Sequence, residues 1–293
     1  MGDRVVITCA LTGAQQGKDR SPAIPEQPDE IIEQGLAAWS AGAAILHIHA
    51  RDERGKATGD VAVFRRILDG LRAGGCDAVI NLTTGGAVAG LPLDERLRVV
   101  PELRPDIASL SIGSGCLLGR WDDRAGAWSG DRAVALFSSH AELEKAARLF
   151  QEHGVRPELE VYHAGMLNNL RALDARGVLD RPLLVNLVMG IPGECTEATV
   201  RDLVHLVGGL PEGAVWQVTA IGAANHFRML AAAVAMGGQV RVGLEDNVYI
   251  ARGELARSNG QVVEKAVRIL GELGVAPATP DEARELLDLG RRA

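Results

Sequence analysis

Two neighbouring histidines and one distant carboxylate are residue types that can bind a catalytic metal. His47 and His49 end the apolar run 43–49, and Glu245 ends a second apolar run near the C-terminal end. Side chains two positions apart on a strand point to the same side, so both imidazoles can face one point. Two histidines and a carboxylate, with a fourth position open, are the pattern of a catalytic zinc site. A structural pair of water-bonded histidines is the alternative.

An arginine lies inside the same apolar run as that carboxylate. Arg241 precedes Glu245 and Asp246, and a buried guanidinium requires a carboxylate partner. One interpretation is a structural ion pair. The other divides the roles, so that Glu245 binds the metal while Arg241 holds Asp246 as a general base.

Hydroxyls and glycines follow a third apolar run. The segment Thr83-Thr84-Gly85-Gly86 combines hydroxyls with free backbone N–H groups, which together can bind an anion. Ser109, on a further apolar run, can add a donor. The competing interpretation of the 83–86 segment is a plain turn. For Ser109 it is a buried hydroxyl that is hydrogen-bonded within the barrel.

Acidic residues alternate with apolar ones in a fourth run. Glu158 and Glu160 are separated by Leu159, so one face of this expected strand is acidic. A role in a polar pocket and a salt bridge to a neighbouring strand remain alternatives.

Short apolar runs alternate with longer helical patterns along the whole chain. Expected strands span residues 5–10, 44–49, 78–82, 107–112, 158–162, 183–187, 215–220 and 240–243. Expected helices span residues 29–40, 60–73, 93–103, 141–153, 165–176, 197–207, 223–236 and 260–273. Eight strand–helix units predict a closed (β/α)8 TIM barrel, here a single domain over residues 1–293 with a short C-terminal helix after Thr279.

The candidate residues fall where such a barrel builds its site. Most of them end or follow strands, and active sites of these barrels lie at the C-terminal ends of the strands. An open doubly wound sheet is the alternative architecture, but the GxGxxG segment expected after its first strand is absent from residues 12–17.

Composition excludes several functional classes. The net charge is −7, aromatic residues make up 3% and no basic stripe occurs, which argues against nucleic acid. No run approaches the ~20 apolar residues of a membrane span, and the first residues resemble a strand entry rather than a signal peptide. The four cysteines form no CxxC pair, which is typical of reduced thiols in a cytoplasmic protein.

With these residues assembled, the chain resembles the β-keto acid cleavage enzyme family. The resemblance covers essentially the whole chain, and the stretch around Arg241 and Glu245 is the most specific. The matching segments are residues 7–10 with 13–14, 47–49, 84–88, 158–161 with 165–166, and 236–249.

The resemblance implies a zinc-dependent barrel that works as a homo-oligomer, typically a tetramer. Such enzymes convert a β-keto acid and acetyl-CoA into acetoacetate and a new acyl-CoA. Position by position, the family's zinc ligands fall on His47, His49 and Glu245, and its Arg and Asp pair on Arg241 and Asp246. Its substrate-binding hydroxyls fall on Thr83 and Ser109, while Thr84, Gly85 and Gly86 are placed to hold carboxylate or oxyanion oxygens.

One position departs from the family pattern. Where a member acting on an amino-substituted keto acid has a Glu, this chain has Gln15, and a neutral amide cannot neutralise an ammonium group. A substrate with a neutral polar or apolar tail is therefore expected. Glu160 matches a second acidic position, and it could replace the missing charge if its side chain enters the pocket.

Three other functions compete with this interpretation. A zinc-dependent aldolase or hydrolase on the same barrel would need no CoA. A non-catalytic metabolite-binding barrel would keep only a vestigial site. The His-x-His pair also occurs in amidohydrolase barrels, but there it lies on the first strand rather than on the second.

Overall fold

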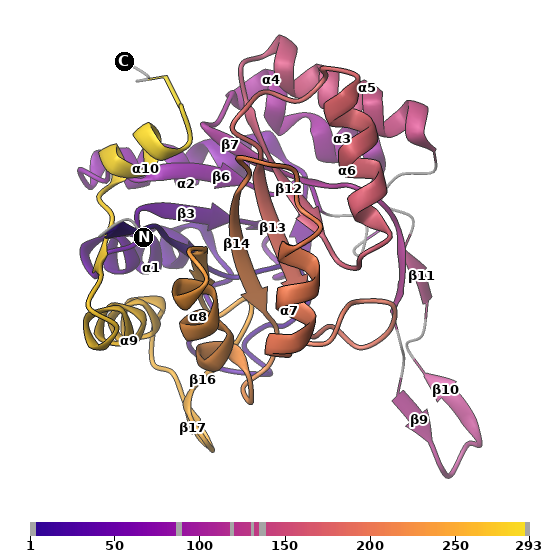
Figure 1. The fold of residues 1–293 in the computed structure, drawn as a ribbon. Helices are drawn as coiled ribbons and strands as arrows, with labels where there is room; N and C mark the ends of the chain where they lie inside the picture. The colour runs from indigo at the N-terminus through magenta and orange to yellow at the C-terminus, as the bar shows by residue number, and fades with distance from the viewer. Residues whose placement is uncertain (1–3, 86–89, 118–119, 130–131, 135–138, 291–293) are drawn as a thin grey trace.

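The computed structural model describes residues 4–85, 90–117, 120–129, 132–134 and 139–290. Gly86 lies outside these residues, so the structure does not place it. Eight parallel strands close into a barrel and helices surround it, as Figure 1 shows. The predicted TIM-barrel fold is confirmed.

The barrel strands follow one another around the ring nearly in chain order. Their order is β12-β13-β14-β15-β2-β3-β6-β7, closing back on β12. The strands are β2 (Ile7–Ala10), β3 (Ile45–Ile48), β6 (Val79–Leu82), β7 (Ile107–Ser111), β12 (Arg156–Val161), β13 (Leu184–Met189), β14 (Val215–Ala220) and β15 (Gln239–Val242). All eight predicted strands are present, with boundaries within two residues of the predictions.

The helices match the predicted order, with one break. They are α1 (Pro28–Ser40), α2 (Val61–Ala73), α3 (Leu93–Leu97), α4 (Val99–Leu103), α5 (His140–Glu152), α6 (Met166–Ala175), α7 (Val200–Val207), α8 (His226–Ala235), α9 (Asn259–Glu272) and α10 (Pro280–Leu286). The helix predicted over 93–103 is two helices that meet at Arg98. Pro101 has no N–H to donate to Leu97, which removes one bond of a continuous helix there.

The C-terminal helix closes the bottom of the barrel. Thr279 and Glu282 form the predicted capping box that begins α10. Ala283 and Leu287 then pack on the apolar lower ends of the strands, including Ile45 and Val79. This cluster excludes water from the bottom of the lumen, so the open end lies at the C-terminal ends of the strands.

Short strands beside the barrel form an arm and small hairpins. β8 (Gly115–Leu117) pairs with β11 (Arg132–Val134), and β9 (Arg120–Asp122) pairs with β10 (Ala127–Ser129). The β9–β10 end extends well away from the barrel (Figure 1). The remaining two-stranded sheets pair β1 (Arg4–Val5) with β18 (Ala276–Pro277), β4 (Ala50–Arg51) with β5 (Ala57–Thr58), and β16 (Tyr249–Ala251) with β17 (Glu254–Leu255). Within the described ranges, no helix is long and apolar enough to cross a membrane.

Candidate metal and substrate site

The predicted metal ligands come together at the C-terminal end of the barrel. His47 lies on β3, His49 directly follows that strand, and Glu245 follows β15. The Nε2 atom of His49 lies 3.4 Å from Oε1 of Glu245, and Nε2 of His47 lies 3.8 Å from Oε2. One ligand atom from each of the three residues lies within 4.8 Å of the others.

These separations fit a divalent metal ion. Ligands about 2.0–2.1 Å from a tetrahedral zinc lie roughly 3.3 Å apart. Oε2 of Glu245 is buried and has no hydrogen-bond partner among the described residues. An unpaired buried carboxylate oxygen that faces an imidazole nitrogen is the expected geometry of a ligand pair around an ion. Two imidazoles and a carboxylate suit zinc among the divalent metals.

Electrostatics keep His47 and Glu245 in the protonation states that can bind a metal. Burial is the main cause that lowers the pKa of His47 well below its usual value, which leaves the ring neutral. Burial alone would raise the pKa of Glu245, but His49 and Arg241 outweigh it and hold that pKa well below its usual range. A neutral imidazole and an ionised carboxylate are the forms that bind metals.

Arg241 joins both neighbouring carboxylates. Its Nε donates to Oδ2 of Asp246 at 3.0 Å and its Nη2 donates to Oδ1 at 2.9 Å. The same Nη2 donates to Oε1 of Glu245 at 2.7 Å. The two roles expected of Glu245 and Asp246 are thus linked through one guanidinium. Burial raises the pKa of Asp246 although Arg241 opposes the change, so its basicity increases.

A cavity of about 590 Å³ opens beside this cluster. His49, Glu245, Arg241 and Asp246 line it together with four predicted substrate-binding residues, which are Gln15, Thr83, Gly85 and Glu160. Its apolar wall is formed by Val188, Ile191, Pro192 and Ile221. The volume is in the range of small-molecule sites.

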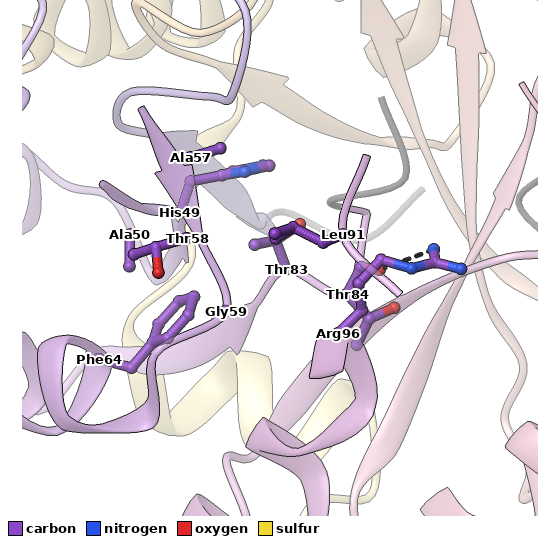
Figure 2. Close-up of a pocket in the computed structure, with 10 residues that line it drawn as sticks. All are labelled: His49, Ala50, Ala57, Thr58, Gly59, Phe64, Thr83, Thr84, Leu91 and Arg96. Carbon is purple, nitrogen blue, oxygen red and sulfur yellow. Dashed lines mark hydrogen bonds between the residues drawn. The ribbon is translucent and has the colours of Figure 1, made fainter. Parts of the chain in front are cut away.

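Two predicted substrate-binding residues do not line this cavity. The Thr84 hydroxyl donates to the carbonyl of Ser109 at 2.5 Å, and the Ser109 hydroxyl accepts from the Thr84 N–H at 3.1 Å. Figure 2 shows Thr84 with Arg96 in a side recess of about 10 Å³ that shares His49 and Thr83 with the main cavity. Thr84 and Ser109 therefore brace the wall behind Thr83.

The structure adds Tyr162, which the sequence did not single out. Tyr162 and Ser111 both donate to Oε2 of Glu160, at 3.0 and 2.5 Å, so Glu160 has two hydroxyl partners. Neither Glu160 nor Glu158 forms a salt bridge with any residue in the described part of the chain. The alternation of residues 158, 160 and 162 on one strand face was a signal for Tyr162.

The loop after β2 is tied to the metal cluster by residues outside the motifs. Gln16 donates to the carbonyl of Glu245 at 2.6 Å. Arg51 donates to the carbonyls of Thr12 and Gln16 at 3.2 and 2.5 Å. Spacing gave no signal for these contacts, because the partners lie far apart in the chain.

Comparisons with known proteins place the chain in a family. The model for the beta-keto acid cleavage enzyme family matches residues 4–289. A 3-keto-5-aminohexanoate cleavage enzyme of Fusobacterium nucleatum is 38% identical over 99% of each chain. A 3,5-dioxohexanoate:acetyl-CoA acetone transferase of Paraburkholderia graminis is 36% identical over 98% of this chain and 96% of the relative.

A solved structure supports the fold independently. The apo structure of ObcA superposes with a TM-score of 0.79 at 19% identity, over 92% of this chain and 66% of that chain. This likeness shows the fold alone. The family model and the relatives cover nearly the full chain, and this chain is therefore an enzyme of the β-keto acid cleavage enzyme family.

Proposed function

We propose that this enzyme is a zinc-dependent transferase that exchanges acyl groups between a β-keto acid and acetyl-CoA. The supporting observation is the cluster of His47, His49 and Glu245 beside the Arg241–Asp246 pair, of which all but His47 line the cavity. The relatives with acetyl-CoA in their names support the co-substrate.

The proposed reaction balances without a redox partner. A β-keto acid R–CO–CH₂–COO⁻ and acetyl-CoA give acetoacetate and R–CO–CoA. A carbon–carbon bond forms between C2 and the acetyl carbonyl, the acetyl thioester bond breaks, and CoA then joins the original keto carbon as the C2–C3 bond breaks.

The residues of this chain divide the work of that exchange. A bound zinc ion would act as a Lewis acid toward the keto oxygen, which makes the C2 protons more acidic. The carboxylate of Asp246 accepts a proton from C2 while Arg241 keeps it oriented. The Thr83 hydroxyl lines the cavity and accepts from the Gly85 N–H at 2.9 Å, so its own proton is available to donate to a substrate carboxylate or oxyanion oxygen.

We propose a neutral polar or apolar tail for the β-keto acid. The cavity wall of Val188, Ile191, Pro192 and Ile221 suits such a tail, and Gln15 offers hydrogen bonds without charge. Four carboxylates line the cavity among the described residues: Glu245 and Asp246 of the metal cluster, Asp19 and Glu160. Glu160 already accepts hydrogen bonds from two hydroxyl groups, which makes it less available to a cationic tail.

A panel of β-keto acids incubated with acetyl-CoA, with acetoacetate as readout, tests this function. Product formation that requires acetyl-CoA supports the transferase. Cleavage of the keto acid without acetyl-CoA would instead support the aldolase or hydrolase. Absence of both turnover and bound metal would favour the non-catalytic alternative.

We also propose that one barrel domain of this kind works within a homo-oligomer in the cytoplasm. The β9–β10 arm extends away from its own barrel (Figure 1), where another subunit could contact it. Of the cysteines whose side chains are described, Cys9, Cys76 and Cys195 are free thiols, which suits a reducing compartment. Light scattering on the purified protein measures the subunit number.

A further inference from the structure

The middle of the barrel lumen is polar on every strand. Interiors of such barrels are usually filled by Val, Ile and Leu. Here each strand contributes one buried polar residue at this level: Thr8, His47, Asn81, Ser109, Glu158, Asn186, Gln217 and Arg241. They occur as register neighbours on adjacent strands, in the pairs His47–Asn81, Ser109–Glu158, Asn186–Gln217 and Arg241–Thr8.

Part of this layer forms a hydrogen-bonded chain that ends on Glu158. The Thr8 hydroxyl donates to Oε1 of Gln217 at 2.9 Å, and Nε2 of Gln217 donates to Oε1 of Glu158 at 2.6 Å. These two hydrogen bonds hold Oε1 of Glu158 in place. The other oxygen, Oε2, is buried without a partner at full hydrogen-bond geometry among the described residues.

Four more buried atoms in the layer lack such a partner among the described residues. Three of them lie on neighbouring strands and are Nδ1 of His47 and both amide atoms, Oδ1 and Nδ2, of Asn81; the fourth, Nδ2 of Asn186, lies on the opposite side of the ring. A buried polar group without a hydrogen-bond partner destabilises the folded chain, so such a cluster requires an explanation. The atoms are complementary, because the imidazole Nδ1–H and the amide Nδ2–H donate while Oδ1 and Oε2 accept.

The geometry of His47 decides which nitrogen takes which role. Its Nε2 faces Glu245 at 3.8 Å, so Nδ1 lies on the other side of the ring, away from that carboxylate. Asn81 is its register neighbour on β6. A metal-binding imidazole usually donates its second N–H to a carbonyl or carboxylate.

Asn81 also acts on both neighbours electrostatically. Burial dominates in each case, lowering the pKa of His47 and raising that of Glu158 to about 7. The Asn81 side chain opposes the effect of burial on the pKa at both residues, although neither contact meets full hydrogen-bond geometry. Together with the pairing of Asn81 and His47 on adjacent strands, this influence indicates that the amide is within reach of both groups.

We propose that Asn81 and Glu158 are positioning residues that hold His47 by a relay, from Nδ1–H to Oδ1 of Asn81 and from Nδ2–H to Oε2 of Glu158. The inference rests on the proposed function, because His47 must be held for a metal ion. Gln217 and Thr8 anchor the far end of the relay. Neither Asn81 nor Glu158 contacts the substrate cavity, so their effect reaches the site through His47.

Zn²⁺ affinity of the metal-free protein, measured by competition with a chelating dye, tests the relay without any turnover. Asn81→Leu keeps the approximate shape but removes both hydrogen bonds, and we expect about 10–100-fold weaker Zn²⁺ binding. Asn81→Asp retains an acceptor for Nδ1 and should bind more tightly than Asn81→Leu. Glu158→Gln should weaken binding in the wild-type background but change nothing further in Asn81→Leu, since its effect passes through Asn81.

Asn186→Leu is the matched control. Asn186 is buried in the same layer on β13, which lies opposite β3 in the ring, and its Oδ1 accepts from Thr219 at 2.7 Å. Its Zn²⁺ affinity should equal that of the wild-type protein. Equal weakening in Asn186→Leu and Asn81→Leu would mean a general packing effect and overturn the relay.

The remaining outcomes separate the relay from the proposed function. Unchanged affinity in Asn81→Leu and Glu158→Gln, with tight wild-type binding, overturns the relay alone. If Asn81→Leu does not fold, Glu158→Gln and Asn81→Asp still test the relay. The Zn²⁺ affinity of their double variant is then compared with those of the two single variants, and additive losses of affinity would overturn the relay. No Zn²⁺ binding by the wild-type chain overturns both the metal site and the relay.

Discussion

Glu158 should make the protein less stable as the pH rises. Its carboxyl group is fully buried, and burial raises its pKa from 4.5 to about 7, with Arg241 opposing the change. Between these two values the folded chain binds more protons than the unfolded chain. The free energy of unfolding therefore falls as pH rises through this window, and Glu158→Gln should remove that fall.

The size of the effect follows from the two pKa values. A pKa raised from 4.5 to about 7 corresponds to a loss of ~3 kcal/mol once the pH exceeds the folded value. About 2 kcal/mol of this is already lost near pH 6, and almost none near pH 4. Gln at this position can still accept from Gln217, which keeps that hydrogen bond.

Urea unfolding of the metal-free protein between pH 4.5 and 8.5 measures the effect. We expect the stability of Glu158→Gln relative to wild type to rise by ~3 kcal/mol across this range. Glu264→Gln, an exposed position on α9, serves as control and should give a constant difference. A constant difference for Glu158→Gln as well would refute the reasoning, because the carboxyl would then titrate alike in the folded and unfolded chains.

Three further predictions concern the site. Purified protein should contain one zinc per chain by elemental analysis, and the double variant His47→Ala/His49→Ala should contain none; a full complement in the variant would exclude these ligands. Asp246→Asn should keep its zinc but lose about 10²–10⁴-fold in kcat, and Arg241→Ala should be at least as harmful because it leaves buried carboxylates unpaired; near-normal turnover in Asp246→Asn would assign the proton transfer to another group. An uncharged β-keto acid should have a higher kcat/KM than 3-keto-5-aminohexanoate, and Gln15→Glu should shift the ratio of the two kcat/KM values toward the amino compound. A wild-type preference for the amino compound would instead mean that Glu160 recognises the ammonium group.

Local sequence patterns were sufficient for the elements and for the direction of many side chains. The alternation in residues 43–49 correctly put His47 and His49 on one face of β3. The signals at Thr279 and Glu282 correctly marked the start of α10. These features depend on residues close together in the chain, so period and capping chemistry determine them.

The helix break at Arg98 shows a limit of such patterns. Apolar spacing over 93–103 indicated one helix, but Pro101 cannot make the bond that a continuous helix needs. The apolar periodicity correctly predicted helix on both sides of Arg98, but it did not predict the break between α3 and α4.

Contacts between strands were decided only by the closed barrel. Alternation indicates that Asn81 and Glu158 point inward, but not that one lies beside His47 and the other accepts from Gln217. The sequence predicted Thr84 and Ser109 as substrate-binding residues, but in the closed barrel they bond to each other and do not line the cavity. Strand number and stagger determine which inward residues share a level of the lumen, and these are properties of the closed sheet as a whole rather than of any one strand.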